Sequence, residues 1–171
     1  MPRYIAFLRG VSPMNASMPD LKRCFETAGF TEVRTLLSSG NVAFTARSTS
    51  PDTLARRARE AMTAGLERSF GTFVRSAGHL QKLVESDPYG GLDVPPDSKL
   101  IVAFLRQAPV SGPSLPIERD GAKILRVAAA EALACYVPGD NGPAFMRLLE
   151  RTFGTDITTR TMDTVRKCAW A

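Results

Sequence analysis

Apolar and polar residues in the first part of the chain form two kinds of pattern that follow one another regularly. Short apolar runs typical of strands cover residues 4–8, 33–37, 42–45 and 73–75. Residues 17–28 and 50–66 instead repeat apolar side chains at helical spacing, with polar residues between them. The resulting order, strand–helix–strand–strand–helix–strand, is the ferredoxin-like βαββαβ pattern. We therefore expect an α+β fold in which the first and third strands are central in an antiparallel sheet and both helices cover one face.

Residues that cap helices and form turns stand at the ends of these segments. Ser17 and Ser50 precede the two helices, and a serine hydroxyl at this position commonly accepts a hydrogen bond from the first helical turn. Gly29 follows the first helix, where a glycine commonly ends a helix with a positive φ angle. The middle strands are joined at Ser38-Ser39-Gly40-Asn41, and glycine followed by asparagine supplies positive φ angles at a turn. These signals predict a β-hairpin between the second and third strands.

The second half of the chain returns to a mixed pattern after a break. A helix is predicted over 76–86, and the segment from Gly90 to Asp97 holds two glycines and two prolines, which favours a domain boundary there. We expect an N-terminal ferredoxin-like domain with an extra helix over 1–89 and a C-terminal α+β domain with a terminal helix over 98–171. The strands predicted in the second domain are 100–105, 122–127, 132–137 and 157–159, and its helices are 143–153 and one starting at 161 or 163. We interpret this domain as a second ferredoxin-like half.

The net charge of +5 comes mainly from arginine, since the 171 residues include 17 arginines and 5 lysines. Arginine is suited to bidentate contacts with phosphate or carboxylate groups. The basic residues are interspersed with acidic ones, and the one tight cluster is Arg56, Arg57 and Arg59, which a helix would spread around its polar face. The charge alone therefore favours a solvated surface over a stripe that binds nucleic acid.

Three cysteines, Cys24, Cys135 and Cys168, lie far apart in the sequence and match no metal-ligand spacing. We expect them to be free, partly buried thiols in a reducing cytoplasm, with Cys24 buried on the inner face of its helix. No segment approaches the ~20 apolar residues that a membrane-spanning helix requires. Because the N-terminal residues enter a strand directly, we also expect no signal peptide. The sequence thus predicts a cytoplasmic location and no membrane partner.

Few residues indicate catalysis. His79 is the single histidine, and its expected place in the first turn of a helix is that of a surface residue, so neither a Ser-His-Asp triad nor a zinc site is predicted. The chain has no Walker phosphate loop and no Gly-x-Gly-x-x-Gly motif. Residues 139–142 have the outline of the GxxG clamp of KH domains, but Asp140 would repel phosphate. We predict no catalytic residue, no metal and no cofactor, and a metal-independent enzyme stays open as an alternative.

Polar residues at the ends of the predicted elements indicate a binding site. Arg9 ends the first strand, and Ser39 and Asn41 lie in the hairpin turn. Arg160 and Thr164 lie at the start of the last helix, where a helix N-terminus beside arginine and hydroxyl groups can bind an anion. We therefore expect these five residues to converge on one cleft between the two halves and to hold a small anionic or phosphate-bearing molecule. The alternative is that they are only helix caps and turn formers.

A further alternative is weak binding of nucleic acid through the first sheet. RNA-recognition domains of this topology stack bases on aromatic side chains of the first and third strands. Tyr4, Phe7 and Phe44 occupy the matching strands here, but the dense basic residues and paired aromatics of that motif are absent. We therefore interpret these rings as core residues. The oligomeric state and the identity of any ligand are not predicted.

Four segments carry a resemblance to a known family. They are Phe7-Leu8-Arg9-Gly10-Val11, Met18-Pro19-Asp20-Leu21, Ser39-Gly40-Asn41-Val42-Ala43-Phe44 and Thr159-Arg160-Thr161-Met162-Asp163-Thr164-Val165. In this order they resemble the bacterial family of domain of unknown function 1697, DUF1697. The resemblance implies a cytosolic α+β protein with two ferredoxin-like halves and no established activity. Residues 12–17 lack the glycine and lysine that many members carry there, and residues 161–164 replace their Asn-Trp-Asn-Thr, so a phosphate-binding role of the 12–17 loop is weakened here.

Overall fold

The computed structural model describes residues 1–139 and 143–171 of the chain. Two antiparallel sheets of four and five strands confirm the predicted α+β class. Contacts within the chain divide it into unit 1, which comprises Met1–Val84 with Arg166–Ala171, and unit 2, which comprises Glu85–Val165. In the described part of the chain, no helix is long and apolar enough to cross a membrane. The GxxG outline at 139–142 lies outside the described residues except for its first glycine.

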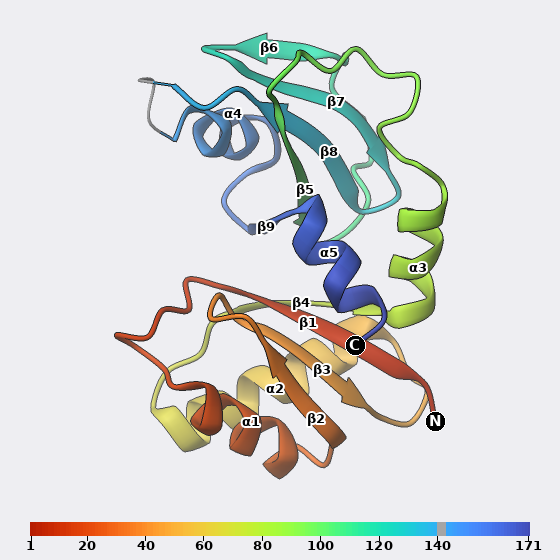
Figure 1. Cartoon of the computed structure of the whole chain (residues 1–171). Helices are drawn as coiled ribbons and strands as arrows, with labels where there is room; N and C mark the ends of the chain where they lie inside the picture. The colour runs from red at the N-terminus through yellow and green to blue at the C-terminus, as the bar shows by residue number, and fades with distance from the viewer. Residues whose placement is uncertain (140–142) are drawn as a thin grey trace. The chain divides into compact units, whose positions relative to one another are not determined.

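Unit 1 begins with the predicted strand–helix–strand–strand–helix–strand order. Its elements are β1 (Arg3–Arg9), α1 (Met18–Thr27), β2 (Thr31–Leu36), β3 (Asn41–Thr45), α2 (Pro51–Leu66), β4 (Gly71–Ser76) and α3 (Ala77–Glu85), whose last residue falls in unit 2. The strands lie in the order β2-β3-β1-β4 and all pairs are antiparallel. Helices α1 and α2 cover one face of this sheet (Figure 1). The central, adjacent position of β1 and β3 is therefore confirmed, and the finer ferredoxin-like classification stays a prediction.

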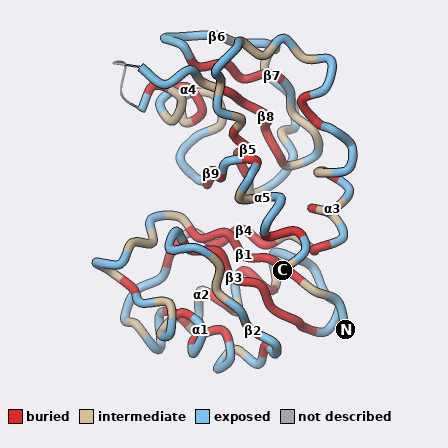
Figure 2. Tube along the Cα trace, in the orientation of Figure 1, coloured by how far each residue is buried: buried red, intermediate tan, exposed pale blue. Residues whose placement is uncertain are grey.

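A cluster of aromatic rings forms the core between this sheet and its two helices. The Phe44 ring on β3 lies 4.4 Å from the Phe30 ring, 5.5 Å from the Phe25 ring and 5.8 Å from the Tyr4 ring, measured between centroids. Successive residues of a strand point to opposite faces, so β1 and β3 place alternate side chains under the helices. Figure 2 shows β1 and β3 buried over nearly their whole length.

The helix ends of unit 1 follow their local sequence signals. The Ser17 hydroxyl accepts a hydrogen bond from the backbone N–H of Asp20 at 3.2 Å, and the Ser50 hydroxyl accepts one from Thr53 at 3.1 Å. Gly29, with a φ angle of +94°, follows the last turn of α1. These caps satisfy backbone groups that a helix end leaves without intrahelical partners. The predicted starts of both helices and the glycine stop of α1 are confirmed.

The β2–β3 hairpin differs from its prediction in one detail. Gly40 has the expected positive φ angle of +82°, but the second positive φ angle of the turn, +58°, belongs to Leu37. Asn41 is already the first residue of β3 and pairs with Phe7 of β1. The backbone carbonyl of Gly40 also accepts a hydrogen bond from the Leu8 N–H at 2.9 Å. The end of the hairpin turn is thus held directly against β1.

Unit 2 is built on the five-stranded sheet. Its elements are β5 (Lys99–Leu105), β6 (Ile117–Arg119), β7 (Ala122–Ala128), β8 (Glu131–Tyr136), α4 (Ala144–Phe153), β9 (Ile157–Thr161) and the start of α5 (Met162–Ala169). The strand order is β6-β7-β8-β5-β9. Leu148 and Leu149 of α4 pack on one face of this sheet with Ile101 and Ile124. The sequence missed β6, which is short and largely exposed, and the described chain has no helix between β5 and β6.

The last residues of the chain belong to unit 1. The side-chain amide of Gln81 donates to the backbone carbonyl of Ala169 at 2.9 Å, and the Arg3 guanidinium donates to that of Ala171 at 3.1 Å. Cys168 is fully buried. The division of the chain into two compact units does not test whether residues 1–89 or residues 98–171 fold independently. These two domain limits therefore stay predictions.

We predict that the cysteine thiols react slowly with alkylating reagents in the native protein. All three are buried and none forms a disulfide. Burial raises the pKa of the Cys24 thiol, an effect to which the Asp20 carboxylate adds, and burial likewise raises the pKa of Cys135. A raised pKa leaves less of the reactive thiolate at neutral pH. Mass spectrometry after iodoacetamide treatment should show Cys24 unmodified without denaturant and fully modified in urea, whereas rapid native labelling would contradict its place on the inner face of α1.

Candidate functional site

Arg9 is the last residue of β1 and lies opposite Gly71 of β4. Its position in the strand alternation puts it on the face of the sheet that α1 and α2 do not cover, together with Ile5 and Phe7. Its side chain is half-buried. Gly10 follows with a φ angle of +86°, which turns the chain out of the strand and into the loop before α1. Arg9 is therefore fixed at one end of the sheet face opposite α1 and α2, which we call the second face. Ile5 and Phe7, in the middle of this face, are fully buried.

Ser39 and Asn41 serve the hairpin turn. The Asn41 side chain is fully buried, and its amide nitrogen donates to the Leu36 backbone carbonyl and to the Ser39 hydroxyl, each at 3.1 Å. An amide NH₂ group has two hydrogens to donate, so these two contacts use both. Ser39 itself is exposed at the tip. Both hydrogens of the Asn41 amide are therefore used to hold the turn, as its interpretation as a turn-forming residue predicts.

The position predicted for Arg160 is wrong, because this residue lies inside β9 rather than at the start of the last helix. Arg160 pairs with Val102 and is buried, and its guanidinium donates to the Thr158 hydroxyl at 3.0 Å and to the Thr159 backbone carbonyl at 2.7 Å. Backbone pairing with β5 extends β9 to Thr161, whereas the sequence predicted that this strand ends at Thr159. The guanidinium is thus oriented by its own strand.

Thr164 belongs to the first turn of α5 as expected. The Thr161 hydroxyl accepts a hydrogen bond from the Thr164 backbone N–H at 3.3 Å and lies 3.1 Å from the Thr164 hydroxyl. This is the geometry of a helix cap. Arg9, Ser39 and Asn41 thus lie at one end of the sheet of unit 1, and Arg160 and Thr164 at the β9–α5 junction of unit 2. Their convergence on one cleft stays a prediction.

Arginines surround the buried apolar middle of the second face of the unit 1 sheet, a feature that the sequence analysis missed. In the strand register, Arg34 of β2, Ala43 of β3, Ile5 of β1 and Arg75 of β4 form one row across the sheet. Arg3 and Arg9 lie at the two ends of β1 on the same face. Among the described strand residues of this sheet, the only acidic one is Glu32, at the irregularity in β2. The alternation of arginine with Ile5 and Phe7 along β1 could have revealed this face.

Two of the three rings proposed for nucleic-acid stacking, those of Tyr4 and Phe44, lie under α1 and α2 and not on the second face. Tyr4 pairs with Phe44 across β1 and β3, and both rings belong to the core under the helices. Phe7 does lie on the other face, but its side chain is fully buried. The interpretation of Tyr4 and Phe44 as core residues is therefore confirmed. A stacking platform of the RNA-recognition type is not formed by these three residues.

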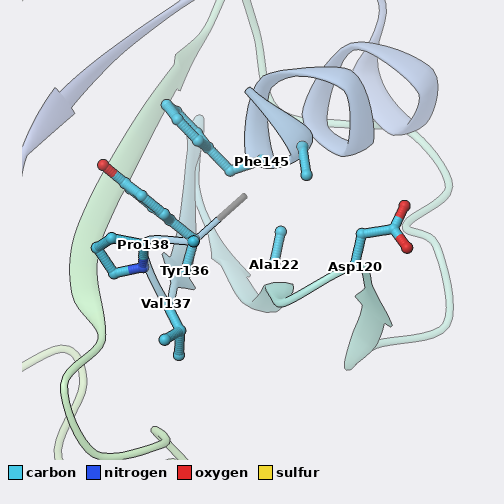
Figure 3. Close-up of a pocket in the computed structure, with 8 residues that line it drawn as sticks. Asp120, Ala122, Tyr136, Val137, Pro138 and Phe145 are labelled. Carbon is cyan, nitrogen blue, oxygen red and sulfur yellow. The ribbon is translucent and has the colours of Figure 1, made fainter. Parts of the chain in front are cut away.

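Unit 2 contains a small pocket of about 130 Å³ that the sequence analysis also missed (Figure 3). The Tyr136 and Phe145 rings stack in its wall, with centroids 4.4 Å apart and planes 10° apart. Asp120 is the only charged side chain among the described residues that line it. A carboxylate disfavours an anionic ligand at this place. Among all described residues, no group of three or more histidine, cysteine or acidic side chains is placed to hold a metal ion.

Two antiparallel sheets, an aromatic core under α1 and α2, and arginines around the rim of the second face of the unit 1 sheet define a two-sheet α+β protein. Residues 1–131 match the family described as "Protein of unknown function (DUF1697)", and the chain belongs to this family. The family resemblance stated from the sequence is thereby confirmed.

One solved structure with a similar fold is the conserved bacterial protein SP0830 from Streptococcus pneumoniae. The two structures agree with a TM-score of 0.66 over 99% of this chain and 97% of that chain, at 17% sequence identity. At this identity the similarity shows the fold alone. The comparison with curated proteins gave no match.

Proposed function

We propose that this DUF1697 protein binds a small anionic or phosphate-bearing ligand through Arg9 of unit 1, with Arg160 and Thr164 of unit 2 as further ligand-binding residues. The observation that carries the proposal is the distribution of charge around the rim of the second face of the unit 1 sheet. Four arginines and, apart from Glu32 at the bulge, no acidic strand residue give that side of the sheet a positive field. We further propose that both units are ferredoxin-like halves and that the protein acts in the cytoplasm.

Arg9 is the arginine of this face best suited to bind a ligand. Arg3 donates to the Glu32 carbonyl, the Thr45 hydroxyl and the Ala171 carbonyl, and these contacts hold it within unit 1. Arg9 is half-buried and ends its strand beside a glycine, where the backbone leaves the sheet and the neighbouring hairpin begins. The exposed Ser39 hydroxyl is a hydrogen-bond donor from the neighbouring hairpin, and Asn41 shapes that hairpin.

The guanidinium of Arg160 is fixed by two hydrogen bonds. Its Nη1 atom is held by a hydroxyl and a carbonyl of its own strand, and this contact limits the side-chain entropy that binding would cost. A preorganised guanidinium binds phosphate or carboxylate through parallel N–H groups. The Thr164 hydroxyl, at the start of α5, is a second donor in the same unit.

The test is an NMR titration of the native protein with inorganic phosphate and with pyrophosphate at constant ionic strength. We expect saturable shifts of the amides near Arg9 and in the 38–41 turn. Arg9→Ala should weaken this binding about tenfold or more, because one charge-assisted contact contributes about 1.5–3 kcal/mol. Arg34→Ala removes an exposed arginine from the same face and is the matched control that should retain binding.

Four outcomes separate the alternatives. Weakening by Arg160→Ala as well as by Arg9→Ala would support one shared site, whereas an effect of Arg9→Ala alone would contradict the role given to Arg160. Small, non-saturating shifts over the whole surface would contradict the proposal. Tight binding of oligonucleotides with a steep salt dependence would favour the nucleic-acid alternative instead.

A further inference from the structure

Unit 1 contains an arginine-lined pocket, far from Arg9, that the proposed function does not use. It has a volume of about 230 Å³ and lies where the turn after α1 meets the end of β3. Arg57 of α2 and Arg47, just after β3, line it together with Gly29, Thr31 and Thr45. No acidic side chain is among the described residues that line it. The pocket therefore presents two positive charges with no opposite charge in its wall.

Arg57 is held in place by two contacts. Its guanidinium carbon lies 4.8 Å from the centre of the Phe30 ring, and its Nη2 atom donates to the Ala28 backbone carbonyl at 2.7 Å. Gly29 permits this approach, because a β-carbon at that position would lie 3.3 Å from the same Nη2 atom. A guanidinium has five N–H groups, and one is used by the carbonyl. Arg57 thus keeps donors for a ligand while its position is fixed by the core.

Arg47 supplies further donors. The Arg47 side chain is exposed and makes no hydrogen bond or ion pair with any residue that the structure describes. The Thr45 hydroxyl instead accepts a hydrogen bond at 3.1 Å from Arg3, its cross-strand partner on the face opposite α2. The pocket thus combines a fixed guanidinium with a movable one.

We propose that this pocket binds a phosphate group, either as inorganic phosphate or as the end of a small phosphomonoester. Two guanidinium groups match the double negative charge of phosphate, and the forked N–H groups of arginine bind its oxygens in pairs. Met1 and Ala46 add an apolar part to the wall that suits the organic group of a phosphomonoester.

The pocket is independent of the site around Arg9. Thr45 pairs with Arg3 at the start of β1, whereas Arg9 is the last residue of the same strand. Six residues of extended chain span about 20 Å. Binding at the two places should therefore perturb different amides, those of residues 28–31 and 45–47 for the pocket and those near Arg9 and the hairpin for the proposed ligand.

The experiment is an NMR titration of the full chain with inorganic phosphate and, separately, with methyl phosphate, at constant ionic strength. Saturable shifts of residues 28–31 and 45–47 are expected, as a group distinct from any shifts near Arg9. Arg47→Ala should weaken this binding about tenfold, the usual effect of losing one charge-assisted contact. Arg56→Ala is the matched control, because Arg56 is exposed on α2 beside Arg57 but does not line the pocket.

Arg57 is tested by Arg57→Lys, since Arg57→Ala would also remove packing on Phe30. Lysine keeps the charge but loses the fork, so weaker phosphate binding is expected without loss of the folded spectrum. Saturation by methyl phosphate but not by phosphate would identify the organic ester as the ligand class, and saturation by both would identify the phosphate group itself. Equal binding by wild type, Arg47→Ala and Arg56→Ala, or shifts that never saturate, would overturn the proposal.

Discussion

Replacement of Phe44 by alanine is expected to lower the free energy of unfolding of unit 1 by about 3–5 kcal/mol. The Phe44 side chain is fully buried, and its ring contacts those of Phe30, Phe25 and Tyr4. Its removal would leave a cavity on a central strand, where neither the sheet nor the helices can close it without moving backbone. A loss of this size is a large part of the stability of an ordinary domain.

Urea unfolding followed by tryptophan fluorescence measures this effect in the appropriate unit. Trp170 is the only tryptophan in the sequence, it belongs to unit 1, and about half of its surface is exposed. Val110→Ala is the control, since Val110 is fully exposed and its truncation should leave the midpoint unchanged. A Phe44→Ala midpoint equal to that of the control would show that the aromatic cluster is not the core of unit 1.

Replacement of Gly40 by alanine is expected to cost about 2–4 kcal/mol, from strain in the left-handed region together with overpacking. Gly40 has a φ angle of +82°, and a β-carbon there would lie 3.0 Å from the Val11 β-carbon and 3.1 Å from the Leu8 β-carbon. Neither neighbour can rotate its β-carbon away, so the hairpin or the loop before α1 would have to move. The displacement would also disturb the anion site proposed at Arg9.

Two other glycines separate the causes of this loss. Gly10 has a φ angle of +86°, but an alanine β-carbon there would meet no atom within 4 Å, so Gly10→Ala measures backbone strain alone. Gly78 lies in α3 with open space and an ordinary φ angle, and Gly78→Ala should raise stability by up to about 1 kcal/mol. If Gly40→Ala is no worse than Gly10→Ala, the hairpin does not pack against residues 8–11 as described.

The order of elements in unit 1 could be predicted because its signals are local. Serine caps, the glycine after α1 and the change between strand and helix periodicity all lie within a few residues of the features that they specify. β6 was not predicted because a short, exposed edge strand has almost no apolar pattern. The extension of β9 to Thr161 was missed for a related reason, since pairing with β5 overrides a polar Thr-Thr-Arg-Thr sequence.

The candidate sites were predicted less well because they depend on contacts between distant residues. Asn41 was identified as a turn residue and a possible ligand contact, and only the structure shows that both hydrogens of its amide are used within the hairpin. Arg57 was seen as one of three clustered arginines on a polar helix face. Its fixed position depends on Phe30 and on the Ala28 carbonyl, and the latter lies 29 residues away from it in the sequence.

The assignment of Arg166–Ala171 to unit 1 has a consequence for biosynthesis. During translation, the first 84 residues leave the ribosome before unit 2, and the residues whose carbonyls accept from Arg3 and Gln81 follow only after unit 2. At about 5–20 residues per second, this delay lasts several seconds. During that interval the nascent unit 1 lacks Cys168 and Ala169, which are fully buried in the folded structure. The surface that these two residues cover is therefore open to chaperones until they have been synthesised.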